Sequence, residues 1–398
     1  MFSSLTTRLR AEVETLKHVL DTHDRLRAVV FPQPEVVDQA GERIVEAAAE
    51  SRHPPGTDEG YLIGIRADAP TKAAWQVYDH CAAFTRLYAV YEQFIEDLVS
   101  EYLRMLPALY PRYEDLPPNV TRQHRVGVGQ ILLRFGKDGP FKELQEREII
   151  QGISEGLLGR PSYTLFPQAF LTDPQNYRSE TVIKLFSYVG FENCWPWVDK
   201  HPLMGTFMEL HRDPNETPKT LLHEFVEYRN KASHTVVRDI VATEEIKSIA
   251  DFVVVLSETL AQLVMKQVVG RKKALGEAMA VGSVLHRFTG NIVGAKMWAG
   301  EIATGDELIV VQKQACFRAT VLSIQVHQTP CEGLTVQEGQ EIGIGLSEKV
   351  NVNAELVRLG RLGQEQRVVT LVESMPEPTS PDEEQPSGEA ETADGSLA

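Results

Sequence analysis

The chain lacks the features that mark secreted, zinc-bound and membrane-spanning proteins. Its four cysteines, Cys81, Cys194, Cys316 and Cys331, are scattered without paired spacing. This argues against both a disulfide framework and a zinc site, so reduced thiols are the simpler interpretation. No stretch of about eighteen apolar residues occurs, and we therefore expect no membrane span.

Motifs that bind a nucleotide cofactor or a catalytic metal are also missing. The sequence contains neither a GxxxxGK(S/T) phosphate-binding loop nor an HExxH motif, so nucleotide hydrolysis and zinc proteolysis have no support. We expect no cofactor and no metal. The first residues, from Met1 to Arg8, resemble no signal peptide, which predicts a cytoplasmic location.

Basic residues are outnumbered, and the formal net charge is −16. This is unusual for an RNA-binding protein, because contact with phosphates normally needs a basic surface. From Glu373 onward the chain holds eight acidic residues and no Lys or Arg, a composition that predicts a disordered acidic tail over 373–398. Without this tail the charge is −8. The tail could screen a groove, repel wrong partners or be passive, and the sequence leaves these open. Basic clusters remain at Arg122, His124, Arg125 and Arg134, and at Arg271-Lys272-Lys273.

The most informative segment that is present is Tyr228-Arg229-Asn230-Lys231-Ala232-Ser233-His234. An arginine stays charged and can contact two phosphate oxygens at once, whereas a histidine changes protonation near neutrality and can move a proton either way. These groups can cleave an RNA phosphodiester without a metal. Each also has a simpler interpretation, because an arginine at a helix C-terminus interacts favourably with the helix dipole and a lone histidine is more often a surface residue.

The segment is predicted to end a helix. Thr217 and Pro218 have the signature of an N-cap and a first helical residue, and Leu221, Leu222 and Phe225 recur on one face. Five residues of helix rotate through about 500°, which separates Arg229 and His234 by roughly 140°. We therefore expect the helix to end or bend between them, before the β-branched run that starts at Thr235.

Amphipathic helices are predicted around this segment. The first residues, from Leu5 to Leu20, form one that must pack on a dimer partner or on the main bundle. Apolar residues from Val77 to Met105 describe a long helix stopped by Pro107, with Glu92 and Glu96 on its polar side. A helix begins at Ser179 and is closed by Gly190, and another follows Thr243. Residues 50–70 are predicted to be a surface connection.

Arg229-Asn230-Lys231-Ala232-Ser233-His234 resembles the Arg-polar-x-x-x-His signature of the HEPN superfamily, the higher eukaryote and prokaryote nucleotide-binding domains. The order of helices resembles the prokaryotic, defence-associated branch, over roughly residues 70 to 268 and most strongly over 176 to 235. In that family two protomers pair so that their motifs face a common groove, and many members are metal-independent endoribonucleases of toxin or antiviral systems.

The resemblance implies roles for three residues. Arg229 would hold the scissile phosphate, His234 would act as acid or base for the attacking ribose 2′-hydroxyl, and Asn230 would orient one of them. The products would be a 2′,3′-cyclic phosphate and a 5′-hydroxyl. The implied partners are RNA, such as transfer RNA, a second copy of the chain through the helical domain, and a protein partner or inhibitor.

A second domain is predicted after Gly270. Six segments have the alternation and length of strands, and six short strands in about eighty residues predict a small barrel. The segments are Val284–Phe288, Ile292–Trp298, Glu307–Val311, Ala319–Val326, Glu341–Leu346 and Val352–Val357.

Three motifs of this region, in order, resemble the second domain of elongation factor Tu and its relatives: 305–308, 319–325 and the glycine-rich 339–346. That resemblance implies a barrel that contacts RNA, but such barrels also dock proteins.

We therefore expect a multidomain chain: an N-terminal helical segment over 1–50, an all-α HEPN-like bundle over 70–270, a small antiparallel β-barrel over 281–360 and the tail over 373–398. The leading hypothesis is a metal-independent endoribonuclease. The alternatives are a non-catalytic RNA- or nucleotide-binding adaptor and a nucleotide-modifying or nucleotide-modified helical domain.

Overall fold

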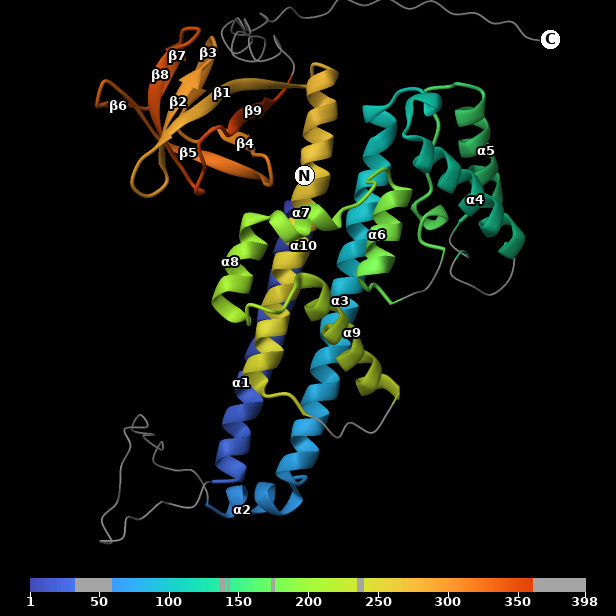
Figure 1. Cartoon of the computed structure of the whole chain (residues 1–398). Coiled ribbons are helices and arrows are strands. Elements are labelled where there is room, and N and C mark those ends of the chain that lie inside the picture. The colour runs from blue at the N-terminus through green and yellow to red at the C-terminus, as the bar shows by residue number, and fades with distance from the viewer. Residues whose placement is uncertain (33–58, 136–140, 142–143, 173–175, 235–239, 361–398) are drawn as a thin grey trace, which may run out of the picture.

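The computed structural model describes residues 1–32, 59–135, 141, 144–172, 176–234 and 240–360, without the side chains of 59–63 and 234. A helical body precedes a barrel of strands (Figure 1). The helices are α1 Ser3–Val30, α2 Glu59–Asp68, α3 Lys72–Leu109, α4 Pro118–Arg134, α5 Glu146–Leu157, α6 Ser179–Tyr188, α7 Trp195–Lys200, α8 Pro202–His211, α9 Pro218–His234 and α10 Thr243–Ala274, with short 3-10 turns η1 Tyr113–Asp115 and η2 Pro167–Ala169.

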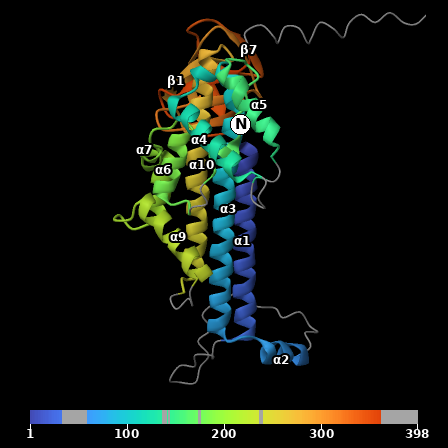
Figure 2. The ribbon, with the colours of Figure 1, turned by 90° about the vertical axis from the view of Figure 1, so that its right-hand side faces the viewer.

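Three long helices, α1, α3 and α10, form the centre of the body (Figure 2). Leu9, Leu98 and Leu256 represent the apolar stripes that these helices bury in one continuous core. Arg10 on α1 donates from Nη2 to Oε2 of Glu258 on α10 at 2.7 Å. The opening helix therefore packs on the main bundle, which answers the question that its sequence left open.

Helix α10 is, among the described residues, the one helix long and apolar enough to cross a membrane. Most of its apolar window, 72%, is buried inside the body. Its hydrophobicity is therefore that of a core helix. The basic residues 271–273 belong to its last turn, where cations interact favourably with the negative end of the helix dipole.

Two other boundaries differ from the prediction. Pro107 lies inside α3, which continues to Leu109. A proline in the last turn removes one hydrogen bond only, and the buried Leu106 and Leu109 hold the turn in place. Within the predicted connection over 50–70, residues 59–68 form α2.

Helices α4, α5 and α6 lie beside the last turns of α3 (Figure 1), and η2 contacts both α3 and α4. Helix α4 approaches η2 so closely that a Cβ added to Gly127 would lie 1.8 Å from the carbonyl oxygen of Ala169. Only glycine fits there. His124, one turn earlier on α4, is fully buried between the rings of Phe166 and Phe170.

The barrel confirms the predicted fold class. Six antiparallel strands close in the order β1-β2-β8-β5-β4-β9 and back to β1. All six predicted strands are present, and three short ones, β3, β6 and β7, were missed. The strands are β1 Ala278–Arg287, β2 Ile292–Met297, β3 Gly300–Ala303, β4 Glu307–Val311, β5 Cys316–Val326, β6 Thr329–Cys331, β7 Gly333–Val336, β8 Glu341–Leu346 and β9 Glu355–Leu359. Residues 373–398 of the predicted tail lie outside the described residues.

The barrel is joined to the body through α10. Lys266 donates from Nζ to the carbonyl oxygens of Gln312 and Lys313, both at 2.7 Å. The backbone N–H of Cys316 donates to Oε1 of Gln262 at 3.0 Å. Barrel side chains such as Ile309 belong to the core of the body, so the two parts are packed together.

Candidate functional site: the Arg229 cluster

Helix α9 positions Arg229 by burying its apolar face against α3. The helix starts as predicted, with Thr217 Oγ1 accepting from the N–H of Thr220 at 3.2 Å. Phe225 then packs between Tyr88 and Tyr91 of α3, with ring centroids 6.0 and 5.9 Å away. One turn later Arg229 lies over the Tyr88 ring, 4.5 Å from its centroid, a cation–π geometry.

Two amide side chains hold the guanidinium. Nη1 of Arg229 donates to Oδ1 of Asn176 and to Oδ1 of Asn230, both at 3.1 Å. Nδ2 of Asn176 also donates to Oδ1 of Asn230 at 3.1 Å. Within the described part of the chain, no carboxylate lies within ion-pair distance of Arg229. We call Tyr88, Glu92, Asn176, Arg229 and Asn230 the Arg229 cluster.

Neither Glu92 of this cluster nor the neighbouring Glu96 on α3 forms an ion pair with the guanidinium among the described contacts. Burial raises the pKa of the Glu92 carboxyl, and the charge of Glu96 raises it further, whereas Arg229 opposes both. Burial also raises the pKa of Tyr88 to about 12. Tyr177 donates from its hydroxyl to Oε1 of Glu96 at 2.9 Å, and its backbone N–H donates to the hydroxyl oxygen of Tyr88 at 2.9 Å. The surroundings are therefore partly desolvated and well hydrogen-bonded.

The expected end or bend between Arg229 and His234 is wrong. Helix α9 is continuous to His234, because Lys231 and Ala232 are good helix formers and the β-branched run starts only at Thr235. The two Cα positions are therefore separated by about 140° around one helix axis. The side chain of His234 lies outside the described residues, so the structure brings Arg229 together with Asn230 and does not place the imidazole.

Sequence reasoning missed Asn176 and Tyr88 as partners of Arg229. Asn176 lies 53 positions away from Arg229 along the chain, and Tyr88 was predicted only as an apolar position of a helix. The one indirect sign of Asn176 in the sequence was the predicted helix start at Ser179, which places Asn176 just before a helix of the same bundle. Among the described residues, no group of three or more His, Cys, Asp or Glu side chains could hold a metal ion.

The predicted basic clusters differ in availability. Arg271 donates from Nε to the carbonyl oxygen of Leu109 at 2.8 Å, Lys272 pairs with Glu277 at 2.9 Å and Lys273 pairs with Glu355 at 2.6 Å. This cluster therefore tethers α10 to its neighbours. Arg122, Arg125 and Arg134 are exposed on α4, whereas His124 is buried.

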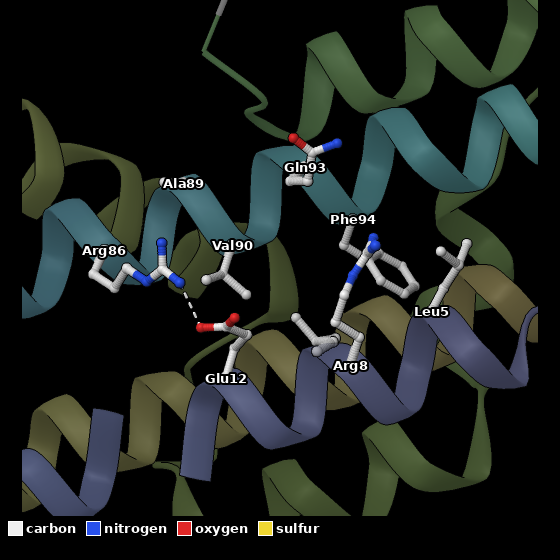
Figure 3. Close-up of a pocket in the computed structure, with 9 residues that line it drawn as sticks. Leu5, Arg8, Glu12, Arg86, Ala89, Val90, Gln93 and Phe94 are labelled. Carbon is white, nitrogen blue, oxygen red and sulfur yellow. Dashed lines mark hydrogen bonds and ion pairs between the residues drawn. The ribbon is translucent and has the colours of Figure 1, made fainter. Parts of the chain in front are cut away.

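A groove of about 360 Å³ lies between α1 and α3, apart from the Arg229 cluster (Figure 3). Arg86 of α3 pairs with Glu12 of α1 across it, and Arg8 of α1 pairs with Asp97 of α3. Each cation of this groove already has a carboxylate partner. The groove is therefore a less favourable anion site than Arg229.

Two solved structures share limited similarity with the chain. The C-terminal domain of a Geobacillus thermoleovorans protein described as a U32 peptidase has 12% identity and a TM-score of 0.19, over 20% of this chain and 99% of that one. GDP-bound aIF5B from Aeropyrum pernix has 16% identity and a TM-score of 0.16, over 34% of this chain and 23% of that one. No curated protein matches the chain.

A family model described as MAE_28990-like HEPN matches residues 10–272. The match starts in α1 and ends in the last turn of α10, so it covers the helical body, the Arg229 cluster included. HEPN domains are generally RNase-like, which gives the chain a nuclease or RNA-related role. The family match extends over more than half of the 398 residues. The chain therefore belongs to the MAE_28990-like HEPN family.

Proposed function

We propose that the protein is a metal-independent endoribonuclease in which Arg229 binds the scissile phosphate. The observation that carries the proposal is the half-buried guanidinium whose described hydrogen bonds go to neutral amides. A guanidinium has five N–H donors, so Nη1 can stay fixed by Asn176 and Asn230 while other donors bind an anion. Because no described carboxylate pairs with it, its charge remains available to a phosphate.

The remaining steps use His234 and the RNA itself. His234 takes the proton of the ribose 2′-hydroxyl, whose oxygen attacks the phosphorus, and the bond to the 5′-oxygen breaks. That oxygen takes the proton from the protonated His234 and leaves as a 5′-hydroxyl, and the other product ends in a 2′,3′-cyclic phosphate. Asn230 orients Arg229, and the Arg229 charge stabilises the phosphorane.

A second copy of the chain would supply the His234 imidazole that one copy does not bring to its own Arg229. Arg229 and His234 lie on different sides of one continuous helix, so the imidazole that serves an RNA bound at Arg229 would come from the partner. The surface that suits such pairing is the outer face of α3 from Tyr78 to Ala89, which we call the α3 face. It forms a hollow of about 570 Å³ lined by Val77, Tyr78, Cys81, Ala82, Thr85, Arg86 and Ala89.

The α3 face adjoins the Arg229 cluster. Ala89 lies three residues before Glu92, and Thr85 three residues before Tyr88, so these pairs are neighbours on the helix surface. Tyr78 is 80% exposed there. In a twofold dimer the same patch of each copy meets the other, so the α3 face of one copy would be buried against that of its partner. We expect Tyr78→Glu to lower the dimer fraction at least tenfold in sedimentation experiments, with Leu210→Glu, an exposed position on α8, as the unchanged control.

Cleavage is tested with purified protein and total cellular RNA in excess EDTA. We expect new ends that carry 2′,3′-cyclic phosphates, and a loss of at least a hundredfold in rate for Arg229→Ala or His234→Ala. Arg104→Ala, at an exposed arginine of α3, should keep the wild-type rate. Cleavage that needs added magnesium, or that survives His234→Ala, would contradict the mechanism.

The finer biological role is that of a cytoplasmic, growth-arresting effector of bacterial defence that acts on transfer RNA or another translation-related RNA. Membership of the HEPN family supports the RNA target class. Expression should arrest growth, and Arg229→Ala should relieve the arrest. Growth arrest that the variant leaves unchanged would contradict this role.

One observation favours a second function, an RNA- or nucleotide-binding adaptor that does not cut. The Cα positions of Arg229 and His234 lie about 140° apart around one unbroken helix, and the Glu92 carboxylate lies close to Arg229. An adaptor would bind RNA through Arg229 and leave it intact. Full-length RNA recovered after incubation with excess dimeric protein, together with binding lost in Arg229→Ala, would establish this function.

A further inference from the structure

We propose that the C-terminal segment 361–398 of the same chain docks on the outer face of α4. This inference goes beyond the proposed ribonuclease and does not depend on it. The α4 face consists of Arg122, Arg125, Val126, Leu133 and Arg134, on a helix that the Arg229 cluster does not use.

The α4 face is apolar and basic at once. Val126 and Leu133 are 49% and 82% exposed, and with Arg122 they follow the spacing i, i+4 and i+11, which is one stripe of a helix. Between them lies Gly129, where an added Cβ would meet nothing within 4 Å. The stripe is therefore open to a ligand along its length.

The charge of the α4 face is uncompensated. Helix α4 contains no Asp or Glu, although the whole chain has a net charge of −16. Among the residues that the structure describes, neither Arg122 nor Arg134 forms an ion pair. A ligand for this face must therefore offer carboxylates or phosphates together with apolar side chains.

The C-terminal segment has carboxylates and apolar side chains close together in sequence. Val368-Val369-Thr370-Leu371-Val372 is an apolar run, and the eight acidic residues from Glu373 onward follow it directly. The bare phosphate backbone of RNA would match the arginines but would bury neither Val126 nor Leu133, so the complex would gain no free energy from removing the stripe from water. The chain's own segment satisfies both parts, and this decides the occupant.

The segment starts close enough to reach α4. The N–H of Gly360 donates to the carbonyl oxygen of Glu277 at 3.0 Å, just after α10, and Arg271 of α10 binds the carbonyl oxygen of Leu109 at the end of α3. Helix α4 begins nine residues after Leu109. A chain of 38 residues can extend over roughly 125 Å, several times the length of α4, which is about 26 Å.

Docking in cis also raises the local concentration of the segment. Attachment within one chain gives effective concentrations that reach the millimolar range, so contacts that are individually weak suffice. The consequence is that the carboxylates of the segment occupy the α4 face and keep RNA and acidic proteins from it.

The test uses the full-length protein with Leu133 replaced by the photoreactive p-benzoylphenylalanine. After irradiation and proteolysis, mass spectrometry should find position 133 linked to a peptide from 361–398. In an equal mixture of unlabelled and ¹⁵N-labelled chains, no cross-link should join a labelled peptide to an unlabelled one, because the contact is within one chain. We call such cross-links mixed pairs. The same photoreactive residue at Leu210, 72% exposed on α8, is the control that should not link to this segment.

Charge variants decide whether the contact is electrostatic. Arg122→Glu with Arg125→Glu should lower the yield of the link at least fivefold, and Arg25→Glu with Arg104→Glu, at exposed arginines elsewhere, should not. Asp382→Asn with Glu383→Gln and Glu384→Gln should also lower it without touching the folded body. No link to 361–398, mixed pairs, or a yield insensitive to both sets of charges would overturn the proposal.

Discussion

The helical body and the barrel differ in what they bury. Among the described residues, every buried polar or charged side chain lies in the body, His80, His124, His201 and Glu258 among them, and none lies between Ala278 and Leu359. The barrel core consists of side chains such as Val284, Val310 and Ile344. Burying polar groups costs free energy unless they are paired, so we expect these side chains to stabilise the body less than an apolar core of the kind found in the barrel.

This difference assigns separate tasks to the two regions. The body holds Arg229 in a desolvated, hydrogen-bonded setting, which suits the binding of a charged ligand. The barrel has an apolar core and is held to α10 by Lys266 and Gln262. We therefore expect substitutions in the body to change reactivity and stability together, and substitutions in the barrel to change stability alone.

The largest expected effect comes from Phe225→Ala. The side chain is fully buried against Tyr88 and Tyr91, so its removal should cost about 3–5 kcal/mol of unfolding free energy and release Arg229, which follows one turn later. Val310→Ala in the barrel core should destabilise the protein and leave cleavage per folded molecule unchanged. Urea unfolding and RNA cleavage at low temperature measure both quantities. If Val310→Ala impaired cleavage as much as Phe225→Ala, the separation of tasks would be wrong.

Acid should destabilise the body more than the barrel. Burial lowers the pKa of His124 to about 4 and that of His201 to about 4, below the unfolded value of about 6.5. The unfolded chain therefore binds more protons, and the stability that these neutral histidines contribute is lost as pH falls from about 6.5 to about 4. The loss is roughly 3 kcal/mol for each histidine by pH 4.

Peptide-resolved hydrogen exchange at pH 7 and pH 4.5, corrected for the intrinsic rates, distinguishes the regions. The segments around His124 and His201 should lose protection, whereas β1 and β8 should keep it. His124→Phe should reduce the loss in its own segment, because it removes the titrating group from between Phe166 and Phe170. Equal losses in both regions would show that the histidines do not set the acid response.

The fold was predictable where local patterns decide it. The caps of α9, the spacing of apolar residues on α3 and the alternation of the six barrel strands each depend on neighbours in sequence. The short strands β3 and β7 pair with each other across 30 residues and have too few residues to show a pattern. Pro107 misled the prediction because a proline ends a helix in isolation, whereas here tertiary packing of Leu106 and Leu109 extends it.

The site was predictable in its residue types but not in its contacts. Arg229 and Asn230 were found from their adjacency, and the continuous helix to His234 contradicts the expectation built on the same spacing. Asn176 and Tyr88 reach Arg229 only because α3, α9 and the segment before α6 converge. Such convergence depends on packing across the whole body, which no local pattern encodes.

A smaller effect is expected where the two regions meet. Oε1 of Gln262 accepts from the Cys316 N–H at 3.0 Å and lies 3.1 Å from Nε2 of His201. Gln262→Ala leaves a buried backbone N–H without its partner, which should cost about 1–3 kcal/mol. Hydrogen exchange should rise at the start of β5 first. Gln93→Ala, which removes an exposed hydrogen bond to Asp97 on α3, is the matched control and should leave β5 unchanged.

The smallest effect is expected at exposed ion pairs, where the two regions should behave alike. Arg86 pairs with Glu12 on the body with side chains 57% and 39% exposed, and Arg318 pairs with Glu307 on the barrel at 35% and 65%. Water and salt screen both pairs, so Arg86→Ala and Arg318→Ala should each change the unfolding free energy by about 0–1 kcal/mol. Urea unfolding at low protein concentration, with and without added salt, measures this. Because surface charge is solvated in either fold, a large effect at Arg86 alone would mean that the body differs from the barrel at its surface as well as in its core.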